Sequence, residues 1–128
     1  MASKAYAGSR VLVVEDEVLI GMVLEDILDM LGCRLAGYAT SLTEAVVAAG
    51  TELDLAILDV NLGGDSSFGL ADELRARGVS VIFATGAAAD SLPDRFRDCA
   101  VLETPYTFAS VEAALDKVFG PSTLAAAS

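Results

Sequence analysis

The sequence contains no histidine, and this absence removes several classes of chemistry at once. It excludes Ser-His-Asp and Cys-His mechanisms and histidine-rich zinc sites, and the chain cannot itself carry a phosphohistidine. There are only two cysteines, Cys33 and Cys99, which lie far apart and outside any CxxC pattern. We expect them to be small core residues of a protein in a reducing compartment. Any chemistry must therefore use carboxylates, hydroxyls or a metal ion.

Long hydrophobic runs and basic residues are also scarce. No stretch approaches the roughly 20 apolar residues that a membrane-spanning helix needs, and Met1 to Ser9 lack the apolar stretch of a signal peptide. The chain has 8 Lys and Arg against 19 Asp and Glu, a formal net charge of −11. This charge repels phosphate groups, so we expect no binding to nucleic acid or membrane, and it favours metal cations and basic partner surfaces. We expect a cytoplasmic protein.

What is present fits one domain with a substantial core, since 54% of the 128 residues are apolar. Apolar runs alternate with amphipathic stretches, which is the pattern of parallel strands joined by crossover helices. Five such rounds are too few for an eight-stranded barrel, so we predict an α/β fold with a doubly wound, five-stranded parallel sheet. We expect a disordered arm over residues 1–9, the domain over 10–120 and a disordered tail over 121–128.

The expected elements follow from apolar patterning, caps and breakers. Strands are expected over residues 10–14, 34–39, 55–58, 79–84 and 100–102. Helices are expected over about 17–31, 41–50 and 67–77, in the alanine-rich segment after Gly86, and from Phe108 to the Gly120-Pro121 stop. Ser41 and Glu44 form a capping-box pattern at the second helix, and Pro93 interrupts the fourth.

Function is expected where the parallel strands end, because ligands of such sheets bind beyond the carboxyl ends of the strands, at the point where the strand order reverses. Strands one and three are neighbours at that point, so Glu15, Asp16 and Asp59 should converge. The residues at the strand ends are Glu15-Asp16-Glu17, Asp59-Val60-Asn61, Thr85-Gly86 and Glu103-Thr104.

A cluster of carboxylates without histidine or cysteine suits Mg²⁺ or Mn²⁺, which relieves the repulsion between the acids. The alternative for Glu15 and Asp16 is that they simply cap the following helix, where the helix dipole favours acidic residues. Asp59 directly follows an apolar strand and does not need to be charged for the fold to close. A carboxylate beside a divalent ion can attack a phosphoryl group and form an acyl phosphate. Thr85 could hydrogen-bond a phosphoryl oxygen, or serve only as a helix N-cap.

Three short segments at these strand ends form a sequence motif together. Each segment alone is weak evidence for a protein family, and the three in this order are specific. They read Val11-Leu12-Val13-Val14-Glu15-Asp16-Glu17, Ala56-Ile57-Leu58-Asp59-Val60-Asn61-Leu62 and Phe83-Ala84-Thr85-Gly86. In this order and spacing the chain resembles the receiver domain of two-component response regulators over about residues 10–119. Its Phe-Ala-Thr-Gly segment is similar to a subgroup of stand-alone bacterial receivers. The resemblance implies a flavodoxin-like fold with strand order 2-1-3-4-5.

The resemblance also implies a phosphorelay function with Mg²⁺ as cofactor. Glu15 and Asp16 would hold Mg²⁺ with the Asp59 carboxylate and the backbone carbonyl of Asn61. Asp59 would accept a phosphoryl group from a histidine kinase or a histidine phosphotransfer protein, and Thr85 would contact that group. Such a domain is not an enzyme beyond self-phosphorylation and self-dephosphorylation. Because no output domain is expected in 128 residues, signalling would pass through protein contacts of the fourth helix, fifth strand and fifth helix, or through phosphoryl relay.

Two positions depart from the receiver pattern. Thr104 stands before Pro105 where receivers usually carry a lysine, so a neutral hydrogen bond replaces a cation that pairs with phosphoryl oxygens. Val101 stands where many receivers have the Tyr or Phe that follows the threonine inward. Phosphorylation should remain feasible but less tightly coupled to conformational change. Tyr106 lies beyond the proline and is not taken as a substitute for that aromatic residue.

These departures support a second hypothesis, a pseudo-receiver that works as a phosphorylation-independent protein adaptor. A third class, phosphatases of the haloacid dehalogenase type, needs an acid two residues after the nucleophile, and Asn61 stands there. On the fifth helix, Ala109, Ala113 and Ala114 would permit close helix packing in a homodimer, although an alanine-rich helix is equally a good helix former.

Overall fold

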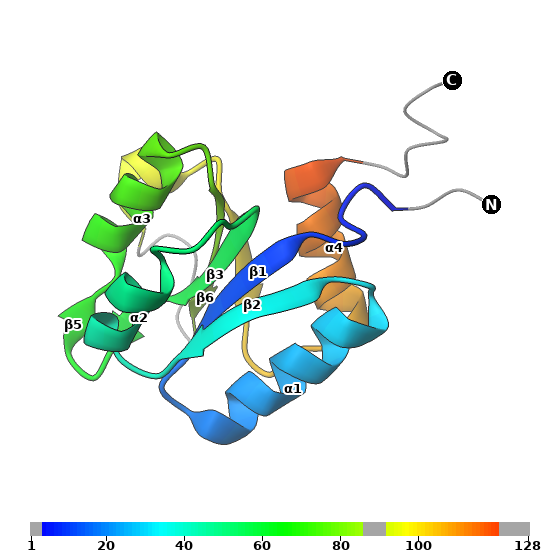
Figure 1. Cartoon of the computed structure of the whole chain (residues 1–128), viewed down its shortest axis with the longest axis horizontal. Coiled ribbons are helices and arrows are strands. Elements are labelled where there is room, and N and C mark those ends of the chain that lie inside the picture. Colours follow the sequence, from blue (N-terminus) through cyan, green and yellow to red (C-terminus); the bar gives the residue numbers. More distant parts are fainter. Residues whose placement is uncertain (1–3, 86–91, 121–128) are drawn as a thin grey trace.

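A computed structural model describes residues 4–85 and 92–120, which form an α/β fold around a five-stranded parallel sheet (Figure 1). The strand order is β2-β1-β3-β6-β7. Since β4 and β5 form a separate small sheet, this is the predicted 2-1-3-4-5 order. The strands of the main sheet are β1 (Arg10–Val14), β2 (Arg34–Ala39), β3 (Leu55–Asp59), β6 (Ser80–Thr85) and β7 (Ala100–Glu103).

The helices cover both faces of the sheet, as a doubly wound topology requires. Helices α1 and α4 pack on one face, and α2 and α3 on the other (Figure 1). No helix of the described ranges is long and apolar enough to cross a membrane. The helices are α1 (Val18–Met30), α2 (Leu42–Ala48), α3 (Phe68–Ala76), the short 3₁₀ helix η2 (Asp94–Phe96) and α4 (Phe108–Phe119).

The inner strand β1 is buried on both sides, which explains its unbroken apolar run. Val11 and Val13 face the cluster under α1 and α4, whereas Leu12 and Val14 face the cluster under α2 and α3. All four side chains are at most 1% exposed. The rigid centre of the sheet therefore fixes where β1 ends and where the acidic residues after it begin.

The N-terminal segment corrects one prediction. Residues 4–9 were expected to be part of a disordered arm, but they form a turn whose Tyr6 side chain is only 1% exposed. The ring packs into the cluster under α1 and α4, and the Gly8 amide donates to the Gly32 carbonyl at 2.8 Å. Burial of the tyrosine ring outweighs the usual fraying of a chain end. Residues 1–3 and the predicted tail 121–128 lie outside the described residues.

The fourth predicted helix lies partly outside the described residues. Over residues 92–99 the chain makes the single turn η2 and no α-helix, and residues 86–91 lie outside the described part. Pro93 precedes the turn and has no amide hydrogen to continue a helix. Phe96 is fully buried against Phe68 and Phe83, so one aromatic anchor holds this short element.

A short hairpin after β3 was not predicted. Strands β4 (Asn61–Leu62) and β5 (Asp65–Ser66) pair antiparallel across Gly63 and Gly64. Both glycines have positive φ, 59° and 96°, a conformation that glycine adopts readily. The hairpin begins at Asn61, two residues after Asp59.

Candidate functional site

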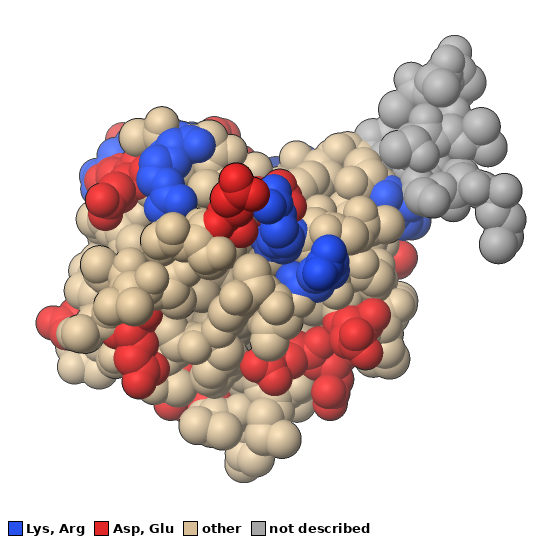
Figure 2. Space-filling view, in the orientation of Figure 1, with Lys and Arg blue, Asp and Glu red and all other residues tan. Residues whose placement is uncertain are grey.

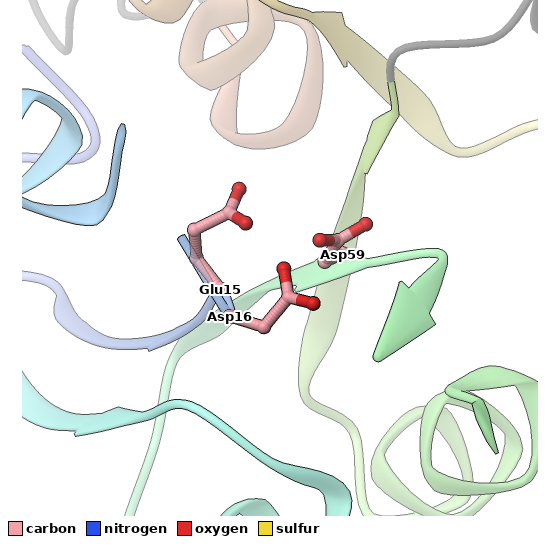
Figure 3. Close-up of side chains that lie close together, drawn as sticks. All are labelled: Glu15, Asp16 and Asp59. Atoms are coloured by element: carbon pink, nitrogen blue, oxygen red, sulfur yellow. The ribbon is translucent and has the colours of Figure 1, made fainter. Parts of the chain in front are cut away.

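The parallel pairing of β1 and β3 brings the predicted carboxylates together. Val14 lies beside Leu58 in the register, so Glu15 and Asp59 leave the sheet at neighbouring points. One carboxylate oxygen from each of Glu15, Asp16 and Asp59 lies within 4.8 Å of the other two. Figure 3 shows these side chains reaching from the ends of the two strands toward a common space. The convergence predicted from the sequence is confirmed for these residues.

The three carboxylates differ in their exposure to solvent. Glu15 is only 4% exposed, Asp59 is half-buried and Asp16 is exposed. Burial raises the pKa of Glu15, and the Glu17 amide, which donates to its Oε2 at 3.2 Å, opposes that rise. Burial and the nearby charge of Glu15 raise the pKa of Asp59 to about 7. The site therefore holds negative charge at an energetic cost that a cation would remove.

This donor set fits a hard divalent cation. All eight Lys and Arg lie in the described part of the chain, and none of them lines this pocket. Carboxylate oxygens without histidine or cysteine are the ligands that Mg²⁺ prefers. Since no basic side chain balances the cluster, a metal ion is the group that would do so.

The pocket over the carboxylates brings most of the predicted site residues together. It has a volume of about 230 Å³. Thr85 is buried at the end of β6, and the Thr104 amide donates to its carbonyl at 3.4 Å. Asn61 lines the pocket as well, but its side-chain Oδ1 accepts from the Gly64 amide at 3.0 Å, within the β4–β5 turn. The residues lining the pocket are Glu15, Asp16, Glu17, Ile20, Asp59, Asn61, Ala84, Thr85, Thr104 and Tyr106.

Sequence reasoning missed Tyr106 as a member of the site. Its side chain is 7% exposed and its hydroxyl donates to Glu15 Oε1 at 3.2 Å across a separation of 91 residues. Tyr38 also reaches Glu15, because its hydroxyl donates to the Glu15 backbone carbonyl at 3.1 Å. The signal in the sequence was that Tyr106 closely follows the predicted site residue Thr104. The direction of its side chain depends on the path of the chain through Pro105.

Comparison with known proteins gives a consistent answer. A family model described as the response regulator receiver domain matches residues 11–102. The solution structure of SdrG from Sphingomonas melonis Fr1 is 42% identical, with a TM-score of 0.77 over 86% of this chain and 95% of that chain. No curated protein sequence is similar enough to count as a match.

Two further structures extend the likeness. One is the BeF3-activated conformation of SdrG from Pseudomonas melonis Fr1, with 42% identity and a TM-score of 0.74 over 87% of this chain and 96% of that chain. The other is the receiver domain of PhyR from Erythrobacter litoralis, with 28% identity and a TM-score of 0.73 over 88% and 91% of the two chains. The fold, the carboxylate site and the family match agree, and the chain belongs to the family of response regulator receiver domains.

Proposed function

We propose that this chain is a stand-alone receiver in phosphorelay signalling, which accepts a phosphoryl group on Asp59 from a histidine kinase or a histidine phosphotransfer protein. The observation that carries the proposal is the convergence of the Glu15, Asp16 and Asp59 carboxylates in one pocket beside Thr85. The relative SdrG has a BeF3-activated conformation, which supports a phosphoryl-responsive site in a protein similar to this chain. A cytoplasmic location is part of the proposal.

The reaction uses an oxygen of Asp59 as the nucleophile. It attacks the phosphorus of the donor phosphohistidine, a P–O bond forms, and the P–N bond breaks with its electron pair leaving on the imidazole, which takes a proton from water. When bound, Mg²⁺ supplies Lewis acidity and offsets the negative charge of the phosphoryl oxygens. Glu15, Asp16 and Asp59 would hold it with the backbone carbonyl of Asn61. Thr85 would hydrogen-bond the phosphoryl group.

An apolar surface beside the pocket suits the docking of the phosphodonor. On α1, Leu19 is 78% exposed and Val18 and Met22 are more than half exposed. A pocket of about 300 Å³ lies between α1 and the segment after β7, and Ile20, Thr104 and Tyr106 line both this pocket and the one over Asp59. Figure 2 shows acidic side chains gathered over α1, so a partner with basic residues around an apolar contact would fit.

The alanine-rich segment of the predicted fourth helix lies outside the described residues, and residues 92–99 carry the η2 turn. We propose that the downstream partner binds the face of β7 and α4, where Phe108 is 45% exposed. Ala114, one of the alanines considered for a dimer contact, is 7% exposed in the core, whereas Ala109 and Ala113 are exposed. A homodimer on this face stays a prediction for sedimentation analysis.

The proposal is tested by intact-protein mass after incubation with acetyl phosphate. We expect a gain of one phosphoryl group that requires Mg²⁺ and is lost in Asp59→Asn. Asp65→Asn is the matched control, because Asp65 is an exposed carboxylate in the nearby hairpin and should leave the gain intact. Phosphorylation of Asp59→Asn at the wild-type rate would refute the assignment.

The second hypothesis, a pseudo-receiver that acts as an adaptor without phosphorylation, is favoured by one observation. No Lys or Arg of the chain lines the pocket, and Thr104 stands where receivers usually carry a lysine. If neither acetyl phosphate nor a panel of phosphorylated histidine kinases labels Asp59 in the presence of Mg²⁺, the adaptor becomes the better description.

A further inference from the structure

The buried Glu15 carboxylate is held from two sides by neutral donors. Its Oε1 accepts from the Tyr106 hydroxyl at 3.2 Å, and its Oε2 accepts from the Glu17 amide at 3.2 Å. The amide contact is local, two residues along the chain. The tyrosine contact comes from the segment after β7, 91 residues away along the chain. It therefore links Glu15 to a part of the chain that β1 and α1 do not position.

The Glu15 carboxylate needs a fixed donor because the nearby carboxylates repel it. Asp16 and Asp59 offer oxygens within 4.8 Å of it, and none of the Lys and Arg residues of the chain lines the pocket to offset the three charges. Without a fixed donor, the Glu15 side chain would relieve the repulsion by rotating away from the two aspartates. Metal affinity falls when a ligand must first be reoriented, since ligating carboxylates are normally held by hydrogen bonds from other residues.

We propose that Tyr106 is the positioning residue of the metal site, whose hydroxyl holds the Glu15 carboxylate toward Asp16 and Asp59. The inference rests on the proposed function, because it assumes that these carboxylates hold Mg²⁺. Tyr106 is suited to the role by its burial, since its side chain is 7% exposed and its ring is locked by packing. It acts through Glu15 and needs no contact with the metal.

The test is a Mn²⁺ titration in which free Mn²⁺ is measured by electron paramagnetic resonance, with Mn²⁺ standing in for Mg²⁺. We expect Tyr106→Phe to weaken Mn²⁺ binding by about 10-fold or more. Tyr6→Phe is the matched control, because the Tyr6 hydroxyl also donates to a glutamate, Glu112 at 3.4 Å, at a place that does not line the pocket. It should bind Mn²⁺ as the wild type does. Urea unfolding in EDTA verifies that each variant is folded.

A double-mutant cycle tells positioning apart from a general structural role. If Tyr106 acts through Glu15, Tyr106→Phe should change Mn²⁺ affinity by less than about two-fold in a Glu15→Gln background, where the oriented charge is already lost. Equal Mn²⁺ affinity of wild type and Tyr106→Phe would overturn the inference and leave the proposed function intact. A wild-type protein that binds no Mn²⁺ would overturn both.

Discussion

At the scale of the residue, Thr104 leaves the pocket without the cation that receivers usually place there. We expect Thr104→Lys to enlarge the structural response to phosphorylation, because an ammonium group pairs with phosphoryl oxygens more strongly than a hydroxyl does. The measurement is the set of amide chemical-shift changes on adding acetyl phosphate and Mg²⁺. Thr104→Met controls for side-chain length without charge. Equal shift changes in wild type and Thr104→Lys would contradict this expectation.

The charge of Asp59 should appear in the pH dependence of stability. Burial and the charge of Glu15 raise the pKa of Asp59 to about 7 in the folded chain, against an ordinary value of 3.8. The folded state then binds the Asp59 proton more tightly than the unfolded state does. The contribution of this proton to the free energy of unfolding is therefore complete below about pH 4 and is lost as the pH rises to about 7.

We therefore expect Asp59→Asn to be more stable than wild type near neutral pH in EDTA, and the difference to shrink toward acid pH. Urea unfolding at several pH values, with and without Mg²⁺, measures the effect. Added Mg²⁺ should stabilise the wild type and not the variant, because the variant lacks a ligand. A stability difference between wild type and Asp59→Asn that does not change with pH would show that folding does not raise the pKa of Asp59.

The site could be predicted from the sequence as far as strand ends determine it. Glu15, Asp16, Asp59 and Thr85 each follow or end an apolar strand, so the topology alone brings them to one edge. Tyr106 could not be predicted, because its hydrogen bond depends on how the chain turns after β7. A sequence pattern reports the spacing along an element but not the direction of a side chain in a loop.

At the scale of the element, α1 and β2 approach each other closely where Gly21 faces Tyr38. A Cβ at Gly21 would collide with the Tyr38 hydroxyl and ring, whereas a Cβ at Gly69 on α3 would meet nothing within 4 Å. We expect Gly21→Ala to lower the free energy of unfolding by about 1–3 kcal/mol, the cost of forcing the ring aside.

Gly69→Ala is the matched control in a helix, and we expect it to raise the free energy of unfolding by about 0.5 kcal/mol because alanine loses less backbone freedom. Urea unfolding of both variants provides the comparison. Equal stability changes in Gly21→Ala and Gly69→Ala would mean that the Tyr38 ring moves aside without a loss of stability.

Helices and strands were predicted correctly where the local sequence carries a cap or a periodic apolar pattern. Ser41 caps α2 as predicted, accepting from the Glu44 amide at 3.2 Å, although the Glu44 carboxylate accepts from Thr40 and not from Ser41 itself. The fourth helix was predicted in the alanine-rich segment after Gly86, and those alanines lie outside the described residues. Beyond Pro93 the described chain makes only the η2 turn, which the buried Phe96 ring holds. The β4–β5 hairpin was missed because two-residue strands leave almost no pattern.

At the scale of the whole molecule, the N-terminal segment contributes to the core. Tyr6 packs beneath α1 and α4, and we expect Tyr6→Ala to cost about 3 kcal/mol or more of the free energy of unfolding, as for other large-to-small changes of buried rings. Tyr6→Phe should cost less than about 1 kcal/mol, since it removes only a long hydrogen bond to Glu112. Chemical denaturation measures both. A near-neutral Tyr6→Ala would mean that the segment is dispensable.

The overall architecture was predictable because its inner strands are continuous apolar runs. Such runs are typical of a parallel sheet that helices cover on both faces. The edge strand β2 was also predicted with the bounds that the structure shows, residues 34–39. The N-terminal segment was not, since it was expected to be disordered and its Tyr6 is only 1% exposed. At the edge of a small domain, the burial of a residue depends on which distant segments pack against it. The local sequence does not contain that information.

The chain has three tyrosines and no tryptophan, so tyrosine dominates its near-ultraviolet emission over the weakly fluorescent phenylalanines. Tyr38 and Tyr106 both donate to the same acidic residue, Glu15, one to its backbone and one to its carboxylate. An event that alters Glu15 thus reaches two of the three fluorophores directly. Tyrosine emission would therefore report the proposed cation binding without a dye or a label.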